Sequence, residues 1–213
     1  MIQLEEKLNF TNELVIGLVS PIGVDLTQIK IHLETVIDQF SYSTQRIKLS
    51  DFFKAAYRGA FAKKITKADT VYKERLAKIS AGNKIRVKSK QNDVLAKYAV
   101  VQIARAREEL IKASKGKFDH RAVYVIDQLK NPEETNLLKR TYGNSYFLIG
   151  IHANMAKRID YLKREFGITE KEARNIIDID DSEPQNTGQQ TRETFHEADL
   201  FIDEENAQCE LSR

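Results

Sequence analysis

The residues best suited to chemistry lie in a glycine-containing turn near the start of the chain. Residues 17–25 read GLVSPIGVD and follow a short apolar run. Loops that hold nucleotide phosphates follow the pattern G-x-x-x-x-G-K-[ST], in which the lysine contacts the β- and γ-phosphates and the hydroxyl helps to hold Mg²⁺. When the pattern is aligned on Gly23, Val24 replaces the lysine and Asp25 replaces the hydroxyl residue. The spacing between the two glycines is also one residue too long.

Two interpretations of this turn stay open. A valine and a carboxylate at these positions remove the cation that offsets phosphate charge and add an anion beside it, so phosphoryl transfer by the usual chemistry should fail. Backbone N–H groups at the start of the following helix can still bind a nucleotide phosphate. In the alternative interpretation, Asp25 only caps that helix and the glycines only form the turn. The candidate nucleotide-binding residues of the turn are Ser20, Gly23, Val24, Asp25, Leu26 and Thr27.

Three charged residues farther along the chain are further candidates for a phosphate site. Asp127 ends an apolar run and could hold a magnesium-bound water, although a carboxylate at that point is also a common helix cap. Arg158 and Arg164 lie in a basic amphipathic segment, where a kinase lid would bring arginines to phosphates. They could equally belong to a solvated basic face.

A basic stretch and a histidine pair indicate other chemistries only weakly. Residues 83–90, NKIRVKSK, read as a connector whose alternating charges could follow a nucleic-acid backbone if it is extended. No aromatic residue for base stacking lies among them, which favours a solvated linker. The pair His196-Glu197 lacks the spacing of the deaminase H-x-E zinc motif, and no P-C-x-x-C follows it. Since Cys209 is the only cysteine, we expect no metal site in this chain.

The elements that must position these residues alternate between strands and helices. Apolar runs predict strands over residues 13–20, 44–49, 121–126, 145–151 and 198–203. Helical patterns cover residues 25–40, 131–142, 155–166 and the residues after 169, and two long helices that break near Gly82 lie between residues 66 and 113. This alternation predicts an α/β fold with a five-stranded parallel sheet and helices on both faces.

The composition fits one domain with a marked charge asymmetry. The chain has 213 residues and a net charge of +3, yet residues 178–205 contain ten acidic side chains and one basic one. The rest of the chain is therefore strongly basic, which favours polyanions such as nucleotides or nucleic acid. We predict an acidic mobile loop over residues 178–192. The sequence has no membrane span and no secretion signal, so we expect a cytoplasmic protein.

Several segments, in order, resemble known families. VYVIDQLKNPEE (123–134), LLKRTYGNSYFLIGIHA (137–153) and ADLFID (198–203) resemble P-loop nucleotide kinases such as dephospho-CoA kinase. With ELVIGLVSPIGVDL in front and TGQQTRETFHEADLFI behind, the chain more closely resembles the amino-terminal domain of the anti-phage dCTP deaminase family. The resemblance implies a degenerate P-loop kinase-like three-layer fold over residues 1–203. It also implies that residues 204–213 begin a linker to a deaminase domain that this chain lacks, so we expect a truncated form.

The resemblance also implies a function. Proteins of this family convert dCTP to dUTP and so deplete nucleotides during phage infection. The zinc ion would belong to the missing deaminase domain. Without that domain, this chain would bind only a nucleotide and would be inactive. The implied partners are a dNTP or NTP, the chain's own deaminase domain, an inhibitory RNA or protein, and further copies of the chain.

Three functional hypotheses follow. The leading one is a regulatory, nucleotide-sensing domain of such a deaminase. The alternative is a divergent nucleoside or nucleotide kinase that uses Asp127, Arg158 and Arg164 in place of the lost lysine. A third hypothesis, a nucleic-acid-binding module, predicts an affinity that falls steeply with salt concentration.

Overall fold

A single parallel sheet organises the chain. The computed structural model describes residues 13–52, 71–113, 121–181 and 190–207. Within them the strands are β1 (Glu13–Val19), β2 (Ser43–Lys48), β3 (Ala122–Asp127), β4 (Tyr146–His152) and β5 (Leu200–Asp203). They lie in the order β2-β3-β1-β4-β5, and every neighbouring pair is parallel. The predicted five-stranded parallel sheet is therefore confirmed.

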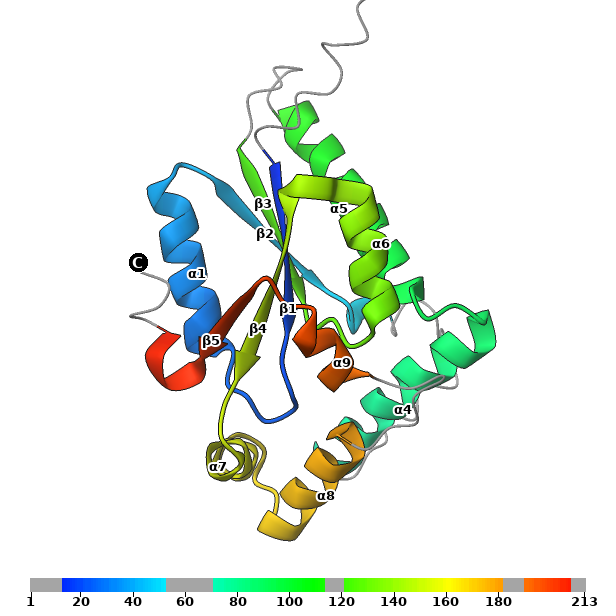
Figure 1. Ribbon diagram of the computed structural model, residues 1–213, viewed down its shortest axis with the longest axis vertical. Coiled ribbons are helices and arrows are strands. Elements are labelled where there is room, and N and C mark those ends of the chain that lie inside the picture. The colour runs from blue at the N-terminus through cyan, green and yellow to red at the C-terminus, as the bar shows by residue number, and fades with distance from the viewer. Residues whose placement is uncertain (1–12, 53–70, 114–120, 182–189, 208–213) are drawn as a thin grey trace, which may run out of the picture.

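Helices cover both faces of the sheet, which makes three layers. The helices are α1 (Thr27–Gln39), α4 (Val71–Ser89), α5 (Val94–Ala113), α6 (Pro132–Tyr142), α7 (Met155–Phe166), α8 (Glu170–Asp181) and α9 (Thr191–His196), with short 3-10 turns η2 (Gly143–Ser145) and η3 (Glu204–Asn206). Figure 1 shows α1 on one face and α5 with α6 on the other. This arrangement is the three-layer α/β fold with helices on both faces that was expected from the sequence. None of the helices in the described ranges is both long and apolar enough to cross a membrane.

The central strands β1, β3 and β4 are largely apolar, and most of their side chains are buried on both faces of the sheet. Successive side chains of a strand point to opposite faces. Val15 and Tyr124 pack against α5 and α6, whereas Ile16 and Val123 pack against α1. On α1, the buried residues Ile29, Leu33 and Ile37 recur every four positions and so form one face of the helix.

A third apolar cluster lies beyond the carboxyl ends of the strands. It joins α4, α7 and α8 through residues such as Ile79, Leu162 and Ile176. Figure 1 shows these helices gathered at the end of the sheet toward which β1 and β4 run. Ligands of open α/β sheets bind at this end of the strands, so the three helices enclose the expected site.

The segment between residues 66 and 113 differs from the prediction. Helix α4 runs through Gly82 and on to Ser89, so the break predicted near Gly82 and the basic connector over residues 83–90 are both wrong. Residues 66–70 lie outside the described residues. A glycine inside a helix costs only about 1 kcal/mol, and packing of Ala81 and Ile85 against the core outweighs that cost. The chain leaves the helix at Lys90, which has a φ of 55°.

Helix ends were predicted with mixed success. Helix α6 begins as expected, with Pro132 in its first turn, and Asn131 and Glu134 form a capping box. Helix α1 begins at Thr27 with Leu26 as its N-cap, and no side chain caps it, so Asp25 is not the N-cap that the alternative interpretation made it. Asp25 still accepts a hydrogen bond from the Thr27 N–H at 2.9 Å.

The acidic segment and the chain end differ partly from the predicted boundaries. Helix α8 continues to Asp181, so the first four residues of the predicted acidic loop are helical, and residues 191–192 begin α9. Residues 182–189 lie outside the described residues. Of the predicted linker, residues 204–206 form η3, and residues 208–213 also lie outside the described part of the chain.

Candidate functional site

The turn between β1 and α1 is held in shape by a glycine and by an arginine from α7. Gly23 has a φ of +92°, a conformation that residues with a side chain rarely adopt. A Cβ atom on Gly23 would lie 2.9 Å from both the Cβ and the carbonyl oxygen of Arg158. The Nε–H of Arg158 donates to the carbonyl oxygen of Ile22 at 2.8 Å. The backbone of α7 therefore lies directly against the turn, and only glycine fits at position 23.

A carboxylate of the protein already occupies this turn. The backbone N–H of Ile22 donates to Oδ2 of Asp180 at 2.9 Å. Nζ of Lys130 lies 3.2 Å from each carboxylate oxygen of Asp180 and donates to the carbonyl oxygen of Ser20 at 2.9 Å. The carbonyl oxygen of Lys130 in turn accepts from the Gln190 N–H at 2.7 Å. Because Asp180 and Lys130 are both buried, this ion pair holds a backbone donor that could otherwise serve a phosphate group.

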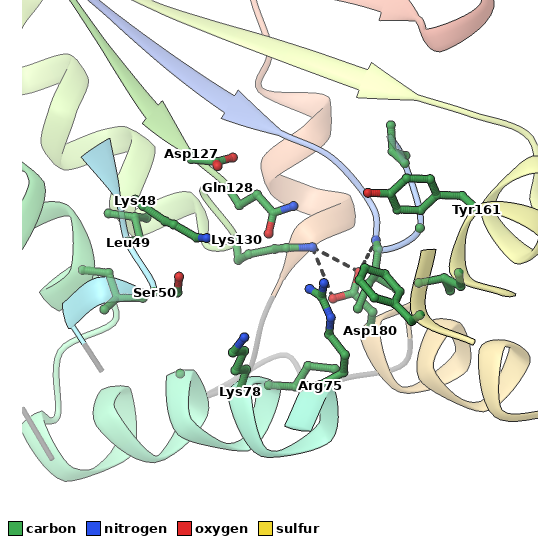
Figure 2. A pocket seen from close by; sticks show the side chains of 18 of the residues that line it. Lys48, Leu49, Ser50, Arg75, Lys78, Asp127, Gln128, Lys130, Tyr161 and Asp180 are labelled. Carbon is green, nitrogen blue, oxygen red and sulfur yellow. Dashed lines mark hydrogen bonds and ion pairs between the residues drawn. The ribbon is translucent and has the colours of Figure 1, made fainter. Parts of the chain in front are cut away.

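A pocket of about 230 Å³ lies beside the turn. It is bounded by the turn itself, the ends of β2 and β3, and helices α4, α7 and α8, as Figure 2 shows from close by. The pocket thus lies at the carboxyl ends of the strands, where the fold predicts a ligand.

The charged side chains of the pocket lining are mostly basic. It contains the basic residues Lys48, Arg75, Lys78, Arg86 and Lys130 and the acidic residues Asp127 and Asp180. Lys78 pairs with Glu74 at 2.5 Å and Arg86 with Glu134 at 2.7 Å. Among the residues that the structure describes, Lys48 has no ion-pair partner. The pocket therefore offers more positive than negative charge to a ligand.

Arg75 is a cation that burial has partly stripped of water. Its guanidinium lies over the Phe166 ring, 3.9 Å from the ring centroid. Burial lowers the pKa of Arg75 below its ordinary value, although an arginine stays charged at neutral pH. No carboxylate in the described part of the chain forms an ion pair with Arg75. An anion entering the pocket would compensate this charge.

The end of β3 brings a carboxylate and a strained backbone to the pocket. Asp127 pairs with Lys30 at 2.5 Å, while its other oxygen, Oδ1, is buried and has no hydrogen-bond partner among the residues described. The next residue, Gln128, has a φ of 65°, which is uncommon for a residue other than glycine, asparagine or aspartate. Strained backbone of this kind concentrates at functional sites.

The structure brings three of the nine predicted site residues into the pocket. Gly23, Val24 and Asp127 belong to its lining. Six residues do not: Ser20, Asp25, Leu26, Thr27, Arg158 and Arg164. Ser20 is buried, and its hydroxyl has no hydrogen-bond partner in the described ranges, whereas Leu26 is buried in the core against α1. Part of the predicted turn thus borders the pocket, while most of its predicted residues lie outside the lining.

The two predicted lid arginines lie outside the pocket lining. Arg158 is buried and pairs with Asp181, with 3.2 Å between Nη2 and Oδ1, in addition to its bond to Ile22. Arg164 is largely exposed and pairs with the adjacent Glu165 at 3.1 Å. In this structure Arg158 fixes the turn and Arg164 belongs to the surface.

The basic residues of α4 were not predicted as site residues. The pocket is lined by five residues of α4: Arg75, Lys78, Ile79, Gly82 and Arg86. The last four follow Arg75 by three, four, seven and eleven residues, which places all five on one face of the helix. The prediction of a connector over residues 83–90 separated Arg86 from the helix that carries the other four residues. A helix continued through Gly82 would have placed Arg86 on the same face as Lys78. The sequence also offered a reason, although a weaker one, to expect Lys130 in the site, because it lies three residues after the carboxyl end of β3.

The described residues hold no group of three or more histidine, cysteine or acidic side chains that could bind a metal ion. The zinc ion implied by the deaminase resemblance was expected outside this chain and stays a prediction. Asp127 alone could contribute one oxygen to a cation carried in with a ligand.

Comparison with solved structures finds kinases across nearly the whole chain. Shikimate kinase from Acinetobacter baumannii in complex with shikimate has a TM-score of 0.45 and 13% identity, and the match covers 95% of this chain and 93% of that one. For a gluconokinase from Sinorhizobium meliloti 1021 the values are 0.42 and 10%, with 94% and 92% covered. For dephospho-CoA kinase from Campylobacter jejuni they are 0.35 and 11%, with 93% and 92% covered. No protein-family model and no curated protein sequence matches the chain.

This likeness concerns the course of the backbone and not the ligand. At such low identities and TM-scores, the fold assignment depends on the strand order and parallel pairing of this chain. The resemblance to the deaminase family is not shown by these comparisons and stays a prediction.

Proposed function

We propose that this chain is a nucleotide-binding domain that takes a phosphorylated ligand in its basic pocket. The observation that carries the proposal is the pocket lining, with five basic side chains against two acidic ones at the carboxyl end of a parallel sheet. A phosphorylated nucleotide supplies several negative charges on one ligand, which is what such a concave basic lining attracts.

The turn after β1 supports binding without phosphoryl transfer. Val24, at the position of the missing lysine, is buried in the core. The N–H of Ile22 is already bonded to Asp180. A transferred γ-phosphoryl group needs cations placed at its oxygens in the transition state. We therefore propose a nucleotide-sensing domain. On the resemblance stated above, its bound nucleotide would regulate a dCTP deaminase domain, which would hold the zinc ion. The remaining partners would be an inhibitory RNA or protein and further copies of the chain.

A divergent kinase is the second candidate, and Lys130 is the observation that favours it. Nζ of Lys130 lies 2.9 Å from the carbonyl oxygen of Ser20, so a lysine from another part of the chain reaches the turn. Asp127, with Oδ1 unpartnered, could hold a magnesium-bound water or accept a proton. In this candidate the ligand would have to draw Lys130 away from Asp180.

Calorimetry with a panel of NTPs, dNTPs and unphosphorylated nucleosides tests the binding proposal. We expect heat from the triphosphates and little from the nucleosides. Arg75→Met should weaken triphosphate binding by about tenfold, because it removes a charge-assisted contact. Arg164→Met removes the same charge from outside the pocket and should leave the affinity unchanged. Equal binding by both variants, or no binding by the wild-type chain, would overturn the proposal.

A phosphoryl-transfer assay separates the two candidates. With radiolabelled ATP and a panel of nucleosides and nucleotides as acceptors, a sensing domain should give no product. Product that disappears in Lys130→Met, while the variant stays folded by circular dichroism, would support the kinase instead. Nucleotide binding that collapses with rising salt as steeply as binding to a nucleic acid would favour the third hypothesis.

A further inference from the structure

Arg86 is a buried cation with incomplete hydrogen bonding. The residue is 2% exposed on the inner side of α4, and its Nη2 donates to Oε1 of Glu134 at 2.7 Å. Its Nε and Nη1 are buried and have no hydrogen-bond partner within the described part of the chain. Guanidinium N–H groups buried without an acceptor are costly and therefore rare in folded proteins. The described residues do not supply the missing acceptor.

The partner of Arg86 cannot supply that acceptor. Oε2 of Glu134 already accepts from the backbone N–H groups of Lys130 and Asn131, at 2.9 and 3.2 Å. Glu134 is completely buried and caps α6 through these bonds. One carboxylate oxygen is thus used by the helix cap and the other by Nη2 of Arg86. The remaining side of the guanidinium is left for a ligand of the pocket that Arg86 lines.

Gly82 makes room in front of Arg86. Lys78, Gly82 and Arg86 succeed one another at intervals of four residues on α4, and all three line the pocket. At 1.5 Å of rise per residue, the Cα atoms of Lys78 and Arg86 lie about 12 Å apart along the helix. Gly82 lies midway and adds no side chain. The pocket therefore has no side chain from position 82 between the two basic residues.

Other cations face the same space. Figure 2 shows the amino groups of Lys48 and Lys78 directed into the pocket from opposite walls. Lys48 has no ion-pair partner among the described residues, and the bond from Lys78 to Glu74 is partly exposed, with side chains 38% and 37% accessible. An exposed pair of this kind is worth little, so Lys78 can turn to a ligand at small cost. The turn after β1, by contrast, has its Ile22 N–H bonded to Asp180.

We infer that α4 carries a phosphoryl-group subsite over Gly82, with the free edge of the Arg86 guanidinium and the amino group of Lys78 as its principal ligands and Lys48 facing it. This inference rests on the proposed nucleotide-binding function and specifies it further. The terminal phosphoryl group of a di- or triphosphate binds α4 instead of the glycine turn. Arginine suits this position because its planar fork can hold two phosphate oxygens at once.

Two variants test the subsite while keeping the fold. Arg86→Lys retains a positive charge for Glu134 but loses the second edge of donors. Gly82→Ala fills the space over the helix and, because alanine is the better helix former, should not weaken α4. Isothermal calorimetry with inorganic pyrophosphate is the measurement, and thermal unfolding verifies that each variant folds. We expect each variant to bind pyrophosphate about tenfold or more weakly than the wild-type chain.

A matched pair on the same helix controls for overall charge. Lys78→Met removes a cation from the pocket, whereas Lys84→Met removes one from the exposed side of α4. Only the first should weaken pyrophosphate binding. The inference is overturned if the wild-type chain does not bind pyrophosphate, or if Arg86→Lys and Gly82→Ala bind it as the wild-type chain does.

The outcome separates the subsite from the proposed function. If pyrophosphate binds and the variants weaken it, but no nucleotide binds more tightly than pyrophosphate itself, then the subsite stands and the nucleotide-binding function fails. If nucleotides bind equally well to the wild-type chain and to both variants, then nucleotide binding stands and the subsite is overturned.

Discussion

Asp180 accepts a hydrogen bond from the backbone N–H of Ile22 at 2.9 Å, although 158 positions of sequence separate the two residues. The contact brings the last turn of α8 against the turn that follows β1. Lys130 completes it from the loop after β3. Three segments that are distant in sequence thus meet at one buried ion pair. The Ile22 N–H of the glycine turn finds its hydrogen-bond acceptor within the protein.

Removing the Asp180 carboxylate should destabilise the protein. Asp180→Ala leaves Lys130 as a buried cation without its partner, so we expect the free energy of unfolding to fall by about 3–5 kcal/mol. Asp180→Asn also loses the charge but keeps an acceptor for the Ile22 N–H, and it should lose about 1 kcal/mol less. Urea unfolding of the three proteins measures these differences. Equal losses in the two variants would argue against a role for the Ile22 hydrogen bond.

Gly23→Ala should cost more than a change of backbone conformation alone. Gly167 offers the comparison, because it has a φ of 61° and nothing lies within 4 Å of a Cβ added to it. Gly167→Ala should therefore lower the free energy of unfolding by about 1–2 kcal/mol. Gly23→Ala adds the clash with Arg158 and should lose clearly more. Similar melting temperatures for the two variants would show that α7 can move away from the turn.

Arg158→Met should affect stability and leave ligand affinity unchanged. The variant loses a charge-assisted hydrogen bond to the Ile22 carbonyl and the pair with Asp181, which we expect to lower the free energy of unfolding by about 1.5–3 kcal/mol. Since Arg158 does not line the pocket, calorimetry should give the wild-type affinity for triphosphates. A large loss of affinity in a folded Arg158→Met protein would restore the lid-arginine hypothesis.

Stability should fall in alkaline solution because of buried tyrosines. Burial raises the pKa of Tyr142 to about 12, compared with about 10 for an unfolded chain. A raised pKa means that the folded protein keeps a proton that the unfolded chain loses. The contribution to stability is therefore fully present below about pH 10 and is lost as the pH rises toward about 12. Urea unfolding at a series of pH values should show this fall.

Tyr142→Phe is the control for that pH dependence. It removes one ionisable phenol and should make the decline in unfolding free energy less steep. Burial also raises the pKa values of Tyr124 and Tyr146, so part of the decline should persist. An unchanged slope in Tyr142→Phe would contradict the assignment.

The sheet and its class could be predicted because the relevant signals are local. Strands buried on both faces read as continuous apolar runs, as in β3 and β4. The start of α6 was readable from Asn131 and Pro132, whose roles as cap and first-turn residue depend only on neighbouring backbone groups. Gly167 likewise ends α7 with a φ of 61°. Each of these signals lies within a few residues of the structure it determines.

Helix α4 was misread for a physical reason. A helix that packs against a core has an apolar stripe on its inner face, but the inner face of α4 lines a polar pocket and contains Arg75, Lys78, Gly82 and Arg86. The polar residues that line the pocket thus interrupt the apolar stripe by which the helix would have been recognised. The glycine in the middle reinforced the wrong interpretation.

The site itself could be predicted only in outline. The rule that ligands bind at the carboxyl ends of parallel strands led to the turn and to Asp127, and both border the pocket. The pairing of Lys130 with Asp180 joins residues 50 positions apart, and no local pattern in either segment reveals it. The carboxylate was expected beside the turn, but from Asp25 and not from α8.

Lys130 contacts Ser20 and Asp180 through its amino group and Gln190 through its carbonyl oxygen. Effects of substitutions at residues that share one partner do not add. A neutral residue at position 180 should be tolerated far better once position 130 has also lost its charge. In chains that diverge from this one, the two positions should therefore covary, exchanging as a pair and seldom singly.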